Sequence, residues 1–116
     1  MTTPLYQLKA EFFKTLGHPV RIRVLELLSE REHSVAEMLP ETNVEASSLS
    51  QQLAVLRRAG IVVSYREGAA VLYALAGPDV ADLMRAARRF LTDMLAGQAQ
   101  LLDELRDTDE TAAVAR

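Results

Sequence analysis

Residues 47–60, SSLSQQLAVLRRAG, combine leucines at helical spacing with many hydrogen-bonding side chains and no acid. This pattern predicts an amphipathic helix over roughly residues 46–59, seated by Leu49, Leu53 and Leu56. Glutamine amides can pair with adenine through two hydrogen bonds, and serine hydroxyls can donate or accept at several bases. Arginine neutralises phosphates, which positions a protein on nucleic acid without reading its sequence. The side chains with this chemistry are Ser47, Ser48, Ser50, Gln51, Gln52, Arg57 and Arg58.

The charge of the chain is unevenly distributed along the sequence. The formal net charge is -3, but five acids and two arginines within residues 103–116 account for all of it. Residues 46–66 contain Arg57, Arg58 and Arg66 and no acid. Binding to phosphates depends on such a local basic patch, so the acidic C-terminal segment does not exclude it.

The residues before this segment predict a short helix and a tight turn. Ser34 followed by Glu37 is a capping box, which opens a helix over residues 35–39. Pro40 should end that helix because it has no N–H for the helical ladder. Asn43 tolerates the left-handed backbone conformation that a tight turn needs.

After Gly60 the apolar period changes from helical to two. Residues 61–66 and 71–75 alternate in polarity around Gly68, which predicts a two-stranded hairpin. This hairpin is the only β signal, so the fold class is mainly α with a small β-hairpin. Helix, turn, helix and hairpin together are the layout of a winged helix-turn-helix, whose second helix enters the DNA major groove. Arg66 on the hairpin is then expected to hold a phosphate.

Two further helices precede the turn, and a long one follows the hairpin. Apolar residues recur at helical spacing up to Gly17, and Pro19 suits the first turn of the next helix. From Val80 onward apolar residues recur in steps of four and three, which is the seam of a coiled coil. A seam of about 28 residues, ~40 Å long, is too long for one small domain to cover, so it predicts a homodimer. The seam residues are Val80, Met84, Ala87, Leu91, Met94, Gln98, Leu101 and Leu105. Those expected at the dimer interface are Val80, Met84, Ala87, Leu91, Met94 and Leu101.

Length and composition narrow the class of protein. We expect one DNA-binding and dimerisation domain over residues 1–107 and a flexible C-terminal tail over residues 108–116, with about five helices and a two-stranded wing in all. With no cysteine there is no disulfide and no thiolate metal site. No apolar run could span a membrane and no signal peptide is evident, so we expect a cytoplasmic protein.

No catalytic motif is present, so we expect neither an enzyme nor a cofactor. The alternative to DNA binding is a protein-interaction module on the same scaffold.

Several segments resemble the ArsR/SmtB family of bacterial winged-helix repressors. They are LGHPVRIRVLELL, SVAEML, SSLSQQLAVLRRAGIVVSYREGAAVLYAL and PDVADLM, and the resemblance covers roughly residues 5–105. It implies a homodimer held by the first and last helices, which adds Leu5, Leu8 and Phe12 to the expected interface. It also implies that paired recognition helices bind double-stranded DNA at a palindromic operator, and that an effector releases the DNA.

The chain departs from the metal-sensing members of that family. Some members carry a cysteine pair in a segment like ELCVCDL, where this chain has HSVAEML. Others bind metal through histidines in the last helix, but residues 78–116 contain no histidine. His18 and His33 precede helices and are expected to be turn or capping residues. The effector is therefore left open between a small molecule, a nonstandard metal site, a partner protein and none.

Overall fold

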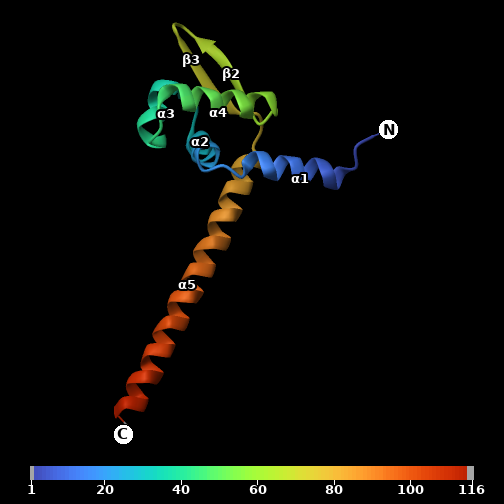
Figure 1. Ribbon diagram of the computed structural model, residues 1–116. Coiled ribbons are helices and arrows are strands. Elements are labelled where there is room, and N and C mark those ends of the chain that lie inside the picture. The colour runs from blue at the N-terminus through green and yellow to red at the C-terminus, as the bar shows by residue number, and fades with distance from the viewer. Residues whose placement is uncertain (1, 115–116) are drawn as a thin grey trace. The chain divides into compact units, whose positions relative to one another are not determined.

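The computed structural model describes the backbone of residues 2–114 (Figure 1). It describes the side chains of residues 2–108. The chain divides into two compact units, one that ends at Met84 and one that begins at Arg85. The elements in chain order are α1 (Leu5–Leu16), α2 (Pro19–Glu30), β1 (His33–Ser34), α3 (Val35–Thr42), α4 (Ala46–Arg58), β2 (Val62–Glu67), β3 (Ala70–Leu75) and α5 (Asp79–Val114). Over the described residues this is a winged helix-turn-helix with five helices, as the sequence predicts.

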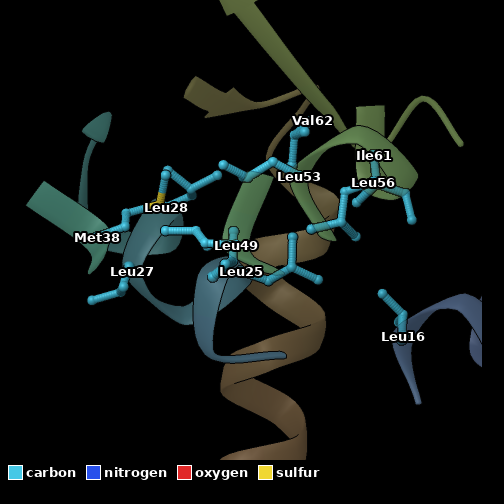
Figure 2. Packing of buried hydrophobic residues seen from close by; sticks show 11 residues of the cluster. Leu16, Leu25, Leu27, Leu28, Met38, Leu49, Leu53, Leu56, Ile61 and Val62 are labelled. Carbon is cyan, nitrogen blue, oxygen red and sulfur yellow. The ribbon is translucent and has the colours of Figure 1, made fainter. Parts of the chain in front are cut away.

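The core of the first unit lies where α2, α3 and α4 meet the base of the β-sheet (Figure 2). The apolar face of α4 was expected to be Leu49, Leu53 and Leu56, and all three side chains are at most 1% exposed. Burying each such leucine contributes about 1.5–3 kcal/mol relative to leaving it in water. Their buried partners include Val24, Leu25, Leu28, Met38, Ile61 and Val62.

The start of α2 is fixed by local side chains. Pro19 occupies the first helical position, and the Nδ1 atom of His18 accepts a hydrogen bond from the Val20 N–H at 3.2 Å. The prediction that His18 is a capping residue is confirmed.

The capping box at the start of α3 is also confirmed. The Glu37 N–H donates to the Ser34 hydroxyl at 3.3 Å, and the Ser34 N–H donates to the Glu37 carboxylate at 3.0 Å. The Ser34 N–H, together with Arg31, lowers the pKa of Glu37 below its ordinary value.

The predicted end of α3 is wrong. The helix continues through Pro40 to Thr42 instead of ending at residue 39. Proline removes one N–H from the ladder and crowds the carbonyl four residues earlier, but the helix tolerates it here. The Thr42 hydroxyl donates to the Leu39 carbonyl at 3.0 Å near the helix end. The helix then ends at Asn43, which adopts the left-handed conformation with φ of 54°.

The expectation that the hairpin is the only β structure is also wrong. A two-residue strand, β1, pairs with β3 and gives a three-stranded antiparallel sheet of order β1-β3-β2. Two residues are too few to show an alternating pattern, so the sequence carries no signal for β1. Gly68 takes the expected positive φ, 62°, in the turn between β2 and β3.

The last helix, α5, begins at Asp79 and is helical to Val114. It therefore continues past residue 108, where the tail was expected to begin. Residues 115–116 of that expected tail lie outside the described residues, and the flexibility of residues 108–116 stays a prediction. Among the described residues, no helix is both long enough and apolar enough to cross a membrane.

Asn43, the left-handed residue between α3 and α4, allows a test of how much the turn conformation contributes to stability. A β-branched side chain is strained at positive φ by about 1–2 kcal/mol, whereas glycine is not. We expect Asn43→Val to lower the free energy of unfolding by about that amount, and the matched Asn43→Gly variant to lower it less, as measured by urea denaturation. Equal decreases in the free energy of unfolding of the two variants would show that the left-handed conformation at residue 43 does not affect stability.

Candidate nucleic-acid interface

The outward row of α4 consists of Ser47, Gln51 and Arg58. All three side chains are exposed. They lie on the side of α4 away from buried Leu49, because residues four and seven apart fall on one helix face. Glu45, at the N-cap position of α4, makes no side-chain capping bond. The row therefore presents a hydroxyl, an amide and a guanidinium group to solvent, with no acid inside the helix.

The flank of α4 that faces the wing forms a hollow of about 250 Å³. The Arg57 guanidinium donates to the hydroxyl of Ser64 on β2 at 3.2 Å, so it braces the wing against α4. Ser50 and Arg58 also line the hollow. The complete lining is Ser50, Leu53, Ala54, Arg57, Arg58 and Tyr73.

The opposite flank of α4 carries Ser48 and Gln52, which are both half-buried. The Gln52 amide oxygen accepts a hydrogen bond from the Nε atom of Arg21 in α2 at 2.7 Å. The structure thus brings together Ser47, Ser50, Gln51, Arg57 and Arg58 on the open side of α4, but it engages Gln52 inside the subunit. Arg66 is exposed on β2, one residue before the end of the strand.

The wing has a second anchor that sequence reasoning missed. The Tyr65 hydroxyl on β2 donates to the carboxylate of Glu32, which lies between α2 and β1. This hydrogen bond to Glu32 raises the pKa of Tyr65 to about 12. The two residues are 33 positions apart, so no local pattern could have indicated the pair.

The residues expected at the dimer interface fall into two groups. Leu5, Leu8, Ala87, Leu91, Met94 and Leu101 are exposed. Phe12, Val80 and Met84 are half-buried and pack against the core of the first unit. In α5, Leu91 and Leu101 are 50% and 55% exposed and belong to a longer series of exposed apolar side chains, and a contiguous apolar surface of this kind is typical of an interaction site.

The Tyr65 anchor predicts an unusual titration. Because the folded pKa is above the ordinary phenol value of ~10, the bond stabilises the protein fully below pH ~10 and is lost as the pH rises through about 12. We expect the tyrosine absorbance of the wild type minus that of Tyr65→Phe to change near pH 12. Glu32→Gln should move this transition towards pH ~10, because it removes the negative charge. A Tyr65 transition at pH ~10 in the wild type would contradict the anchor.

Comparisons with known proteins agree with this geometry. The family model of bacterial regulatory proteins of the arsR family matches residues 18–64. A helix-turn-helix transcriptional regulator of Mycobacterium tuberculosis (strain H37Rv), Rv0081, is 55% identical over 104 residues, which cover 89% of this chain and 91% of that protein. The biofilm growth-associated repressor of Agrobacterium fabrum is 42% identical over 77 residues, or 66% of each chain.

Solved structures show the same fold. The crystal structure of Rv0081 superposes with a TM-score of 0.75 and covers 84% of this chain and 99% of that chain, at 55% identity. The homodimeric winged helix-turn-helix DNA-binding domain of Mb0332 from Mycobacterium bovis gives a TM-score of 0.71 at 30% identity and covers 78% of this chain and 84% of that chain. The chain therefore belongs to the arsR family of bacterial regulatory proteins and is a DNA-binding transcriptional regulator.

Proposed function

We propose that the protein is a repressor that binds a palindromic operator as a homodimer, with α4 of each protomer in the major groove. The observation that carries the proposal is the outward row of α4, which is exposed, free of acids and set on a rigid apolar face. An α-helix fits the major groove, where glutamine and serine side chains reach base edges. In this proposal Ser47 and Gln51 read bases, with Ser48 and Ser50 at the margins of the same face.

The arginines are proposed to hold the DNA backbone. Arg57 and Arg58 border the hollow between α4 and the wing, and Arg66 lies near the tip of the wing. Guanidinium groups bind phosphate oxygens through several N–H groups, which fixes the orientation of a protein on the duplex. Arg57 already donates to Ser64, so it would hold the wing and a phosphate together.

The second protomer is proposed to cover the exposed apolar side chains of α1 and α5. Leu5 of α1 is 66% exposed, and Phe90 of α5 is 68% exposed. Repression is supported by the similar Agrobacterium protein named a repressor, and dimerisation by the homodimeric Mycobacterium bovis domain. We propose that the protein works in the cytoplasm, where bacterial DNA lies.

Binding to the DNA upstream of the protein's own gene, measured by fluorescence anisotropy, tests this function. Six arginines of a dimer at phosphates would give a slope of log affinity against log salt of about -5. We expect Gln51→Ala to reduce binding to the operator on the order of tenfold and binding to an unrelated duplex much less, because a base contact carries about 1–3 kcal/mol of discrimination. Gln100→Ala, an exposed change on α5, is the control.

If the affinity for the duplex changes neither with salt concentration nor in Gln51→Ala, the result would instead favour the protein-interaction module. The same titration with divalent metals and with a chelator tests for a metal effector. Within the described residues, no cluster of three or more histidine or carboxylate side chains could hold a metal ion.

A charged residue in the seam of α5 tests dimerisation. Leu91→Glu places a carboxylate where the partner is proposed to pack, and burying an unpaired charge is strongly unfavourable. We expect this variant to sediment as a monomer and to bind the operator at least about tenfold more weakly. The control is Thr92→Glu, which adds the same charge at the next exposed position, off the seam. A dimeric Leu91→Glu variant would place the interface elsewhere.

A further inference from the structure

We propose that Arg21 is a positioning residue that ties α4 to the end of α1, and that Gln52 is its partner and not a base-reading residue. This inference rests on the proposed function, because it divides the roles of two neighbouring glutamines on the DNA-reading helix.

The guanidinium group of Arg21 bonds to two different helices. Its Nε atom donates to the Gln52 amide oxygen on α4 at 2.7 Å, and its Nη1 atom donates to the Thr15 carbonyl on α1 at 3.1 Å. Arg21 itself belongs to the first turn of α2. The rigid planar fork of arginine can hold two acceptors in fixed directions, which a lysine ammonium on a flexible stem does less well.

The hydrogen bond from Arg21 to α1 satisfies the Thr15 carbonyl, which has no partner within the helix. The last four carbonyls of a helix have no partner within it, and a cation near them is favourable. The Gly17 N–H donates to the Lys14 carbonyl at 3.2 Å, and the His18 N–H donates to the Leu16 carbonyl at 2.7 Å. Arg21 supplies the partner of the carbonyl between them, that of Thr15, so it caps the end of α1.

The bond to α4 changes what Gln52 can do. A glutamine that reads adenine uses its amide oxygen and its amide nitrogen together. The oxygen of Gln52 is engaged by Arg21, and the side chain is half-buried on the flank of α4. Gln51, its neighbour, is exposed in the outward row. Two adjacent and identical residues therefore have different tasks, one in reading DNA and one in holding the helix that reads it.

This arrangement links the proposed dimer contact to the proposed DNA contact. Leu5 and Leu8 of α1 are exposed and are proposed to face the second protomer. Through Arg21, the end of α1 is two hydrogen bonds away from α4. The orientation of α4 relative to α1 is then fixed by the guanidinium group, and a dimer must hold its two recognition helices at one spacing to match an operator.

Glutamate substitutions at the two positions separate these tasks. In Gln52→Glu the carboxylate still accepts from Arg21 and forms a charge-assisted bond, so we expect operator affinity to change less than about threefold. In Gln51→Glu the carboxylate faces the duplex and the adenine donor is lost, so we expect a loss on the order of 100-fold. Equal losses in the two variants would overturn the proposal, because Gln52 would then contact DNA.

A double-mutant cycle tests Arg21. We expect Arg21→Ala, Arg21→Lys and Gln52→Ala each to weaken operator binding by about three- to tenfold. In the Arg21→Ala background, Gln52→Ala should have no further effect, because its partner is already gone. Additive losses would overturn the link.

The cycle also distinguishes failure of the proposed function from failure of this inference. If the wild-type protein binds no duplex, the proposed function fails and the DNA role of Arg21 fails with it. The same cycle, measured by urea unfolding, then still reports whether the Arg21–Gln52 bond exists. If the wild-type protein binds DNA and the cycle is additive, only the positioning role is wrong.

Discussion

The orientation of α4 is set by the burial of one of its faces in the core of the first unit. Leu49, Leu53 and Leu56 are at most 1% exposed, and each contributes about 1.5–3 kcal/mol by its burial. Rotating α4 about its axis would expose them, so the opposite face is fixed before any ligand arrives. The side chains proposed to read DNA are thus carried on an element whose orientation is already set, which reduces the ordering cost of binding.

Hydrogen bonds between different elements fix orientations that contacts within the apolar core do not define. Arg57 holds the wing to α4 through Ser64, and Tyr65 holds it to Glu32 from the other side. Arg21 connects the end of α1 to α4. Two of these bonds involve α4 directly, through Arg57 and Gln52, and the third fixes the wing to the segment between α2 and β1.

The sequence predicts features that depend on near neighbours. The capping box of α3, the left-handed Asn43, the buried leucines of α4 and the hairpin turn at Gly68 are all set within a few residues. The extension of α3 through Pro40 was missed because a proline inside a helix costs one hydrogen bond but does not always end the helix. The strand β1 was missed because pairing with the distant strand β3 decides it. The same holds for the partners of Gln52 and Tyr65, which are 31 and 33 residues away. The sequence pattern around a serine or glutamine on a polar helix face is the same whether the side chain faces solvent or a neighbouring helix.

If the outward row of α4 meets base edges, the side-chain amide of Gln51 reports on that contact directly. Its NMR resonances can be followed while operator DNA, and then an unrelated duplex, is added. We predict a large shift of the Gln51 amide resonances with operator DNA and a different, smaller shift with the unrelated duplex. Unchanged Gln51 resonances in a protein that is fully bound to its operator would show that the outward row does not meet base edges.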